Sequence, residues 1–465
     1  MRFHVLVTMT CIACAAEASA DEPKAKPDLS QPNVVLMMAD DLATEDVSCY
    51  GSKRINTPRL DALAKQGVRL TSYYAGSSVC TPSRMALLSG SYPARLGWRW
   101  GVLGYGLEPR TGMSPAVYTI AECFRDAGYR TALAGKWHVG DRTMSPEHQG
   151  FESAYFLSTS NNLNRDLLRD GRLVRKNWDN RKLTETFTDE VIRVIREKRD
   201  KPFFLYVPWT APHFPAEAHP DWLGKHQDEF VSVVEELDFR VGQILDSLDA
   251  KGIADDTIVI FTSDNGRQAG SQVDPRSTPP YTGMKWQSWE GGTRVPCIVR
   301  WPGKITADTV DDAIMAAIDW YPTLAGMCRI PIEIPDGGQT MDGIDCTATL
   351  MGQNAGPKRT ELLYWHGKGQ ATAIRSGDWK LFFNAGEKDP NVADGALLYD
   401  LSRDAKEQTD VARENPEKAR ELLARARTLL ADIYDDQTPL GTWEGVTPTN
   451  PPLRAEDVWG PLLGE

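Results

Sequence analysis

The chain alternates between short apolar runs and longer amphipathic stretches. Four continuous apolar runs stand out: NVVLMMAD (33–40), KPFFLYVPW (201–209), TIVIFTSD (257–264) and RVPCIVRW (294–301). Such runs are typical of parallel strands that are buried on both faces. Between them lie stretches with helical periodicity, which predict helices: AECFRDAGYRT (121–131), TDEVIRVIREKRD (188–200) and EFVSVVEELDFRVGQILDSLDAKG (229–252).

Two further helices are indicated by the residues at their ends. NTPRLDALAKQG (56–67) has Thr57 in the N-cap position, Pro58 in the first helical position and a glycine at its end. SSVCTPSRMALLSG (77–90) has a proline in the first turn of a helix that ends at Gly90. Strands alternating with helices predict an α/β fold, with a mostly parallel central sheet flanked by helices.

The first twenty residues are typical of a secretory signal peptide. MRFHVLVTMTCIACAAEASA has an early arginine, an apolar run and an Ala-x-Ala cleavage site. The run is too short to cross a bilayer, and no other segment is apolar enough to do so. We therefore expect export to the periplasm or the medium. A lipid anchor is a less favoured alternative, because CIAC matches a lipoprotein cleavage site poorly.

The pattern changes after about residue 355. ATAIRSGDWKLFF (371–383) and ALLYDLSRD (396–404) predict short strands, and NPEKARELLARARTLLADIY (415–434) predicts an amphipathic helix. The expected parts of the chain are a signal peptide (1–20), a large α/β domain (30–355), a smaller α+β subdomain with an antiparallel sheet (356–435) and an extended tail (436–465).

Composition limits the classes of partner. The 465 residues carry a formal net charge of −12, with 41% hydrophobic and 25% charged residues, as in soluble globular proteins. No basic block offsets the negative charge, which argues against a nucleic-acid partner. A small anion can still bind in a locally basic pocket.

The cysteines form no recognisable scaffold. Once Cys11 and Cys14 are removed with the signal peptide, the spacings of the others match neither a disulfide-rich domain nor a zinc site. An exported compartment permits disulfides, and Cys328 with Cys346 is the most plausible pair.

Acids and an amide follow two of the predicted strands. Asp40 and Asp41 end the first run, and Asp264 and Asn265 end the third. Ligands of such sheets bind beyond the carboxyl ends of the strands, so these groups are placed to meet there. Three carboxylates and an amide make an oxygen-only site suited to a hard cation such as Ca²⁺. Each pair alone also fits a turn or a helix cap.

Basic side chains occur in three other segments. Lys136 and His138 lie two residues apart in AGKWHVG (134–140), which puts both on one face if the segment is a strand. A cation beside an imidazole suits an anionic substrate that needs proton transfer. His213 lies between two prolines in TAPHFP, and Lys285 lies in a glycine-flanked loop. Each residue alone also fits a solvated surface position.

Cys80 heads the helix predicted at 77–90, with no other cysteine nearby. It can be a buried structural thiol, the usual state of a lone cysteine. It can be a nucleophile whose thiolate is stabilised by the helix N-terminus. It can also be the precursor of a modified residue.

CTPSR followed by MALLSG resembles the Cys-x-Pro-x-Arg signature of the formylglycine-dependent (type I) sulfatases of the alkaline phosphatase superfamily. The other motifs of that family follow in order: MADD, GYRTALAGKWHVG, APHFP, FTSDNG, GMKWQSWEGGTRVP, AIRSGDWKLFF and LYDLSRDAKEQTDVA. The resemblance covers about residues 32–435 and is to the arylsulfatase A-like branch. It implies an alkaline-phosphatase-like fold, a catalytic domain over 30–355 and hydrolysis of a sulfate ester.

The resemblance also implies a role for each candidate residue. A maturation enzyme, a transient partner, would oxidise Cys80 to formylglycine (3-oxoalanine) in the unfolded chain. Arg84, one helical turn from Cys80, would hold the hydrated aldehyde. One Ca²⁺ would bind Asp40, Asp41, Asp264, Asn265 and the modified Cys80. The groups that grip the sulfate and steady the leaving oxygen would be Lys136, His213 and Lys285.

The implied chemistry explains why a cysteine is needed. One hydroxyl of the hydrate attacks sulfur, and its pKa is lowered by Ca²⁺. The second hydroxyl then gives its proton to His138, and the carbonyl re-forms as sulfate leaves. A serine could attack but would lack this route to release the sulfate.

Other functions remain open. A phosphoester hydrolase of the same superfamily usually uses Thr or Ser with two transition metals and extra histidine ligands, whereas this chain has seven histidines in all. A non-catalytic carbohydrate-binding protein would be expected to lack Cys80, His138 or Lys285, and all three are present.

The esterified group is indicated by the tryptophans. Indole rings pack well against sugar C–H surfaces. The tryptophans near the predicted site loops are Trp98, Trp100, Trp286 and Trp289. Core packing is the alternative for each, and Arg99 and His366 are further candidates for sugar contacts. We therefore expect a sulfated oligosaccharide as substrate, with small aryl sulfates as weak substrates and an arylsulfatase as the alternative.

Overall fold

The computed structural model describes Met1 and residues 31–107, 110–268, 280–353, 356–383 and 396–444. The predicted signal peptide, apart from Met1, and the last part of the predicted tail lie outside these ranges. Within the ranges, every helix is too short or too polar to span a bilayer.

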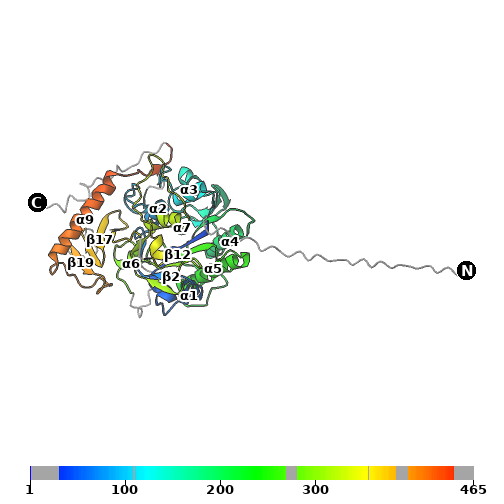
Figure 1. Cartoon of the computed structure of the whole chain (residues 1–465), viewed down its shortest axis with the longest axis horizontal. Coiled ribbons are helices and arrows are strands. Elements are labelled where there is room, and N and C mark those ends of the chain that lie inside the picture. Colours follow the sequence, from blue (N-terminus) through cyan, green and yellow to red (C-terminus); the bar gives the residue numbers. More distant parts are fainter. Residues whose placement is uncertain (2–30, 108–109, 269–279, 354–355, 384–395, 445–465) are drawn as a thin grey trace.

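A ten-stranded sheet runs through the larger part of the molecule (Figure 1), in the order β10-β9-β8-β7-β11-β1-β12-β13-β2-β14. Its five central strands are parallel. They are β1 (Asn33–Ala39), β7 (Arg130–Lys136), β8 (Ser153–Leu157), β11 (Phe203–Pro208) and β12 (Thr257–Ser263). Their carboxyl ends therefore meet at one edge of the sheet, where ligands of such sheets bind.

Antiparallel strands extend the sheet on both sides. The hairpin of β9 and β10 follows β8, while β13 and β2 follow β12, and β14 pairs parallel to β2. Their bounds are β2 (Val68–Leu70), β9 (Leu167–Arg169), β10 (Arg172–Arg175), β13 (Cys297–Arg300) and β14 (Thr309–Asp311). Of the four predicted apolar runs, the fourth is thus an antiparallel strand.

Helices cover both faces of the sheet, because alternate residues of a strand point to opposite sides. Val34, Leu36 and Met38 of β1 belong to the hydrophobic core on one face, and Val35 and Met37 belong to the core on the other. The first face carries α2 (Cys80–Ser89), α3 (Ile120–Asp126) and α7 (Trp320–Met327). The second face carries α1 (Pro58–Lys65), α4 (Leu183–Arg196) and α5 (Glu229–Lys251).

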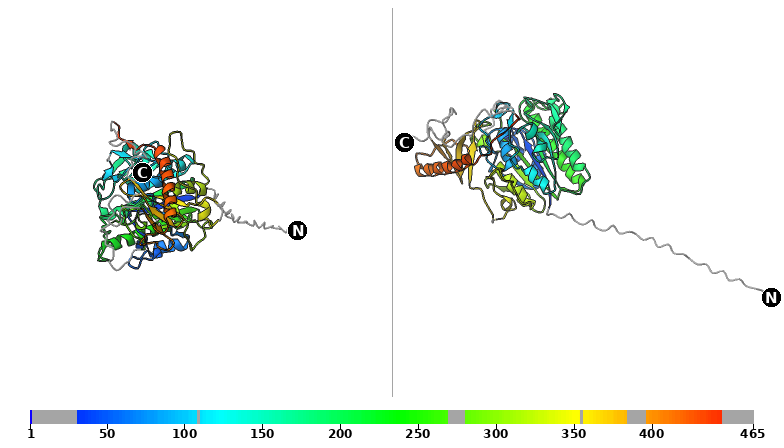
Figure 2. Two further views of the ribbon diagram at one scale, coloured as in Figure 1. Left: turned by 90° about the vertical axis from the view of Figure 1, so that its left-hand side faces the viewer. Right: turned by 90° about the horizontal axis from the view of Figure 1, so that it is seen from above.

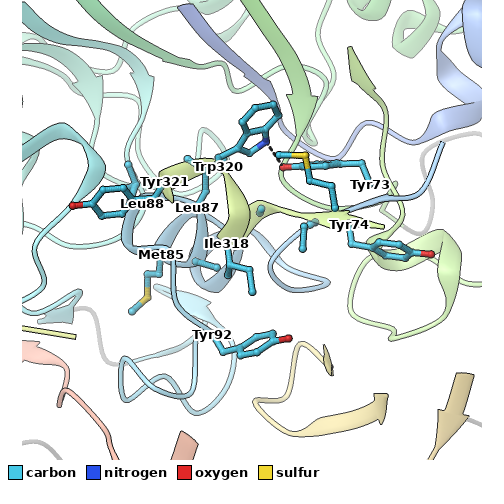
Figure 3. Close-up of a cluster of buried hydrophobic side chains, with 14 of the residues drawn as sticks. Tyr73, Tyr74, Met85, Leu87, Leu88, Tyr92, Ile318, Trp320 and Tyr321 are labelled. Atoms are coloured by element: carbon cyan, nitrogen blue, oxygen red, sulfur yellow. Dashed lines mark hydrogen bonds between the residues drawn. The ribbon is translucent and has the colours of Figure 1, made fainter. Parts of the chain in front are cut away.

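The core around α2 is rich in aromatic side chains (Figure 3). Leu87 and Leu88 of α2 lie close to Trp320, whose indole N–H donates to the Tyr73 hydroxyl over 2.9 Å. Every residue of α2 is buried, and Gly90 ends the helix with φ = 71°. The helix that begins at Cys80 is therefore fixed by packing on its whole surface.

The C-terminal part forms a separate antiparallel sheet of β16 (Glu361–Trp365), β17 (Ala371–Ser376), β18 (Trp379–Phe382) and β19 (Leu397–Asp400). The amphipathic helix α9 (Pro416–Asp435) packs against it. Figure 2 shows both at one end of the molecule, with α4 and α5 at the other. The predicted α/β fold with a smaller antiparallel part is confirmed.

Short elements complete the described chain. They are β3 (Tyr73–Tyr74), β4 (Val102–Leu103), β5 (Gly106–Leu107), β6 (Thr111–Gly112), α6 (Glu290–Thr293), β15 (Met315–Ala316), α8 (Thr347–Leu350) and β20 (Gly441–Thr442). The pairing of β20 with β6 brings the start of the predicted tail back to the larger part of the molecule.

Cys328 and Cys346, the most plausible disulfide pair in the sequence, are both free thiols. Cys328 follows α7 and lies beside Tyr129. Cys346 precedes α8, and its N–H donates to the Thr323 hydroxyl over 2.9 Å. The two residues belong to different local structures, although they are close in sequence.

Thr57 precedes α1 as predicted, but its side chain does not cap the helix. Its hydroxyl accepts from the N–H of Ser48 over 2.9 Å. The free N–H groups of the first turn donate instead to Asp238 on α5, from Arg59 over 3.1 Å and from Leu60 over 2.8 Å. A tertiary contact thus replaces the local cap.

Candidate active site

The carboxyl ends of the parallel strands bring the predicted site residues together. Asp40 and Asp41 follow β1, Lys136 ends β7, and Asp264 and Asn265 follow β12. The loop after β11 carries His213, the loop before α6 carries Lys285, and Cys80 begins α2. All of these side chains are buried.

Two basic side chains, Lys136 and Arg84, form ion pairs with Asp40 and Asp264. The Lys136 ammonium lies 2.6 Å from Asp40. The Arg84 guanidinium donates to Asp264 through Nε and Nη2, over 3.0 and 2.7 Å, and Nη2 lies 3.4 Å from Asp40. Its third nitrogen donates to the carbonyl of Lys136 over 2.8 Å. Arg84 therefore holds the carboxylates in place, and its predicted contact with a hydrated aldehyde stays a prediction.

Asp41 has a different set of partners. Lys285 Nζ lies 2.7 Å from its Oδ1, and the Asn265 amide donates to the same oxygen over 2.6 Å. His213 Nε2 lies 3.7 Å from Asp41 Oδ2. The backbone of Asp41 has φ = 67°, which an L-residue rarely adopts. The N–H of Asp41 donates to Asp264 over 3.2 Å, so the two strand ends are linked.

The charges of this cluster act in opposite directions on its acids. Burial acts to raise the pKa of Asp40, but the charges of Lys136, His213 and Arg84 outweigh it and hold that pKa well below its usual range. Burial and the charge of Asp40 raise the pKa of Asp264 to about 7, against the effect of Arg84. Further positive charge beside the pair would favour the ionised form of both acids.

Two buried oxygen atoms of this cluster have no hydrogen-bond donor among the described residues. They are Oδ1 of Asp40 and Oδ1 of Asn265. Ligand atoms of Asp40, Cys80 and Asp264 lie within 4.8 Å of one another, and so do those of Asp40, Asp41 and His213. Buried oxygens without donors are costly unless a cation satisfies them, so the donor set fits a metal ion.

His138 lies just beyond the end of β7, with φ = 59°. The prediction that it shares a strand face with Lys136 is therefore wrong, since strand alternation stops at Lys136. Its Nε2 lies 3.0 Å from the carbonyl oxygen of Leu103, and its own carbonyl accepts from the Thr81 hydroxyl over 2.9 Å. Burial, followed by the charge of Lys136, lowers its pKa well below the ordinary value.

Cys80 lies in a pocket of about 340 Å³. The residues that line it are Cys80, Val102, Gly104, Tyr105, His138, Ser160, Asn162, Leu163, His213, Gln268, Lys285 and Trp286. Burial raises the pKa of the Cys80 thiol although Lys136 and Lys285 lower it. The neutral thiol is thus favoured, which argues against the thiolate nucleophile and leaves the buried thiol and the precursor as alternatives.

The predicted tryptophans divide into two groups. Trp286 lines the pocket, and Trp100 is 41% exposed nearby. Trp98 is buried and donates to the carbonyl of Gly101 over 3.0 Å, and Trp289 packs against Phe382 with ring centroids 4.5 Å apart. Core packing is therefore the role of Trp98 and Trp289. Arg99 and His366 are not among the described residues that line the pocket.

Sequence reasoning missed several lining residues. The Ser160 hydroxyl lies 3.3 Å from Lys136 Nζ and 3.4 Å from His213 Nδ1, between two of the predicted groups. It follows β8, whose carboxyl end meets the same edge as β1 and β7. The polar stretch after that strand was the available signal. Nothing in the local sequence marks Tyr105 or Leu163.

Comparisons with known proteins agree with this geometry. The Sulfatase family model matches residues 32–330, and a model for the C-terminal part of N-sulphoglucosamine sulphohydrolase matches residues 285–434. Arylsulfatase A of Homo sapiens is 30% identical, over 81% of this chain and 82% of its own. N-acetylgalactosamine-6-O-sulfatase of Bacteroides thetaiotaomicron is 28% identical, over 83% of this chain and 91% of its own.

The chain also resembles solved structures in its fold. The crystal structure of Ps i-CgsB in complex with k-i-k-neocarrahexaose superposes with a TM-score of 0.74 at 25% identity, over 88% of this chain and 94% of that one. The family model covers more than half of the chain. The chain therefore belongs to the sulfatase family, the enzymes that hydrolyse sulfuric esters.

Proposed function

We propose that this protein removes sulfate from a carbohydrate ester, with formylglycine made from Cys80 at the reacting position and one Ca²⁺ beside it. The observation that carries the proposal is the position of Cys80 in a pocket between His138, His213 and Lys285, with the acid cluster behind it. Two relatives support a sugar, since one is an N-acetylgalactosamine-6-O-sulfatase and another was solved with a neocarrahexaose.

The ion fits the donor set. Asp40, Asp41, Asp264 and Asn265 would hold Ca²⁺, which prefers carboxylate and amide oxygens. When bound, the ion would supply positive charge against a sulfate oxygen and lower the pKa of a neighbouring hydroxyl. The oxidised Cys80 would supply that hydroxyl once hydrated.

The remaining roles follow from the contacts of each side chain. Lys285 and His213 reach both the pocket and Asp41, so they are placed to bind a sulfate oxygen next to the metal ligands. Ser160 holds Lys136 and His213 at a fixed separation. His138 lines the pocket with Nδ1 unpartnered among the described side chains, so that atom would accept the proton.

The experiment is a desulfation screen with protein matured beside a formylglycine-generating enzyme. Glycosaminoglycan and algal oligosaccharides are compared with aryl and steroid sulfates, and Cys80→Ala is the inactive control. Mass spectrometry of the Cys80 peptide checks its conversion to the aldehyde. Activity on sugar esters that tracks this conversion supports the proposal. Activity confined to aryl or steroid esters refutes the sugar assignment, and activity with unmodified thiol refutes the role of formylglycine.

A further inference from the structure

Aromatic rings line part of the Cys80 pocket, beside the groups proposed to hold sulfate. Tyr105 and Trp286 both line it, with ring centroids 5.7 Å apart and planes at 77°. Trp100 packs on Tyr105 from outside, with centroids 6.3 Å apart. Tyr105 is 63% exposed, whereas Lys285 and His213 are buried, so the Tyr105 ring lies closer to solvent than the groups proposed to bind sulfate.

The loop that carries Tyr105 is tightly held. Val102 and Tyr105 exchange backbone hydrogen bonds of 2.8 and 2.9 Å, with Gly104 between them at φ = 83°. The N–H of Gly101 donates to the carbonyl of Gly367 in the C-terminal part over 2.7 Å. A side chain at Gly104 would meet Leu163 at 2.8 Å, so the loop packs closely on Leu163, another residue that lines the pocket.

Trp286 is fixed by backbone contacts on both sides. Its N–H donates to the carbonyl of Ser78 over 2.9 Å, and its carbonyl accepts from Gly367 over 3.2 Å. It has φ = 78°, which few L-residues adopt. The backbone segments that carry Tyr105 and Trp286 are therefore both held in place before any ligand arrives, which lowers the entropic cost of binding.

The described lining of the pocket carries little positive charge outside the sulfate-binding groups. Lys285 is its one permanently charged side chain, and it is already paired with Asp41 at 2.7 Å. The side chains nearest to solvent are the phenol ring, Leu163 and the amide of Asn162. These groups suit a neutral ring with hydroxyls and an apolar face better than a second sulfate.

We propose that Tyr105 and Trp286 form an angled platform for the sugar ring that carries the scissile sulfate, and that the site prefers a ring with a single sulfate. The face of Tyr105 stacks on the apolar face of the sugar, while Trp286, at 77° to Tyr105, borders that ring. The inference rests on the proposed carbohydrate function and names the part of the substrate that this wall recognises. Stacking aligns the ring, while the Asn162 amide and the Tyr105 phenol hydroxyl have hydrogen bonds available for its hydroxyl groups.

The test measures binding without turnover. Full-length Cys80→Ala protein is titrated, in the presence of Ca²⁺, with inorganic sulfate, galactose 6-sulfate, N-acetylgalactosamine 6-sulfate, D-glucosamine-2-N,6-O-disulfate and 4-nitrophenyl sulfate. At least one monosulfated sugar should bind about tenfold more tightly than inorganic sulfate. Adding Tyr105→Ala should remove that gain and leave inorganic sulfate unchanged, and Tyr105→Phe should keep most of it.

Phe239→Ala, at an exposed ring on α5, is the matched control and should change no affinity. Sugars that bind no better than inorganic sulfate, or a Tyr105→Ala effect equal on all ligands, would overturn the platform. Tighter binding of the disulfate would overturn the single-sulfate preference, and a loss confined to 4-nitrophenyl sulfate would assign the rings to aryl esters. These results are separate from failure of the proposed function, which is the absence of sugar desulfation by matured wild type.

Discussion

The Nε2 atom of His138 lies 3.0 Å from the carbonyl oxygen of Leu103, while Nδ1 has no partner among the described residues. A carbonyl oxygen only accepts hydrogen bonds, so Nε2 carries the proton and Nδ1 has its lone pair free. Burial and the charge of Lys136 hold the pKa of this imidazole well below the ordinary value. His138 is thus a neutral imidazole with one nitrogen ready to accept a proton.

If His138 is the base, as proposed, its replacement should slow turnover. His138→Gln should lower kcat by about 10²- to 10⁴-fold, the usual contribution of a positioned general base. Sulfate binding and the unfolding temperature should change little, because Gln also has a donor for the Leu103 carbonyl. The measurement is steady-state kinetics of matured protein, with the exposed His148→Ala as control. A kcat within threefold of wild type would exclude His138 as the base.

The buried oxygens without donors lead to a second prediction. If Asp40 and Asn265 hold Ca²⁺, adding Ca²⁺ to chelator-treated protein should raise its unfolding temperature, because a ligand at 100 times its Kd stabilises the native state by about 2.7 kcal/mol. Thermal unfolding with and without Ca²⁺ measures this shift, independently of activity.

The shift should shrink strongly in Asp40→Asn and persist in Asp246→Asn, whose side chain is exposed on α5. Mg²⁺ should be a poor substitute, since it requires a smaller and more regular octahedral site. An equal shift in both variants would mean that Ca²⁺ stabilises the protein from another site.

The positions of Asp40, Asp41, Asp264 and Asn265 at strand ends could be predicted, because one rule covers all four. Apolar runs such as 33–40 identify parallel strands, and polar residues at their carboxyl ends must share an edge. The position of His138 could not be derived in this way, since a positive φ beyond the strand turns it away from the alternation. Tyr105 was missed because only the contacts of its loop with Gly367 and Leu163 place it in the pocket.

Expectations from the local sequence were not met where residues far away in the chain formed the contacts instead. Thr57 has the sequence of a cap, but Asp238 on α5 takes the N–H groups of α1 and Thr57 bonds to Ser48. Cys328 and Cys346 are near in sequence, yet the packing of α7 and α8 gives each its own neighbours. Sequence spacing carries no information on such tertiary competition.

A buried lysine links the C-terminal sheet to α6 of the larger part. Lys380 Nζ lies 3.0 Å from Glu290 and 2.7 Å from Glu407, and all three side chains are fully buried or nearly so. Lys380→Met would leave both acids without their shared cation. We expect a loss of about 3–5 kcal/mol in the free energy of unfolding, typical of a broken buried ion pair.

Urea denaturation measures this loss, with Lys418→Met, at a partly exposed position of α9, as the control. Burial raises the pKa of Glu407 to about 7, so protonation of Glu407 limits the damage at lower pH. A loss below about 1 kcal/mol at pH 8 would show that Lys380 contributes little to the contact between the C-terminal sheet and α6.

Asp238 accepts hydrogen bonds from the first turn of α1, and its pKa leads to a prediction with a defined pH dependence. Burial raises the pKa of Asp238 to about 6, although the N–H groups of Leu60 and Arg59 lower it. Its unfolded value is about 3.9. Between these values the native state holds a proton that the unfolded state has lost, so the contribution of Asp238 to stability is full below about pH 4 and declines as the pH rises to about 6.

Asp238→Ala should therefore cost most near pH 4, by about 1–3 kcal/mol from the lost cap hydrogen bonds, and less above pH 6. Urea denaturation of both proteins across this range gives the difference at each pH. Asp249→Ala, an exposed acid on the same helix, should change stability by less than about 0.5 kcal/mol throughout. A cost that grows with pH would show instead that the two N–H groups of α1 hold Asp238 in its charged form.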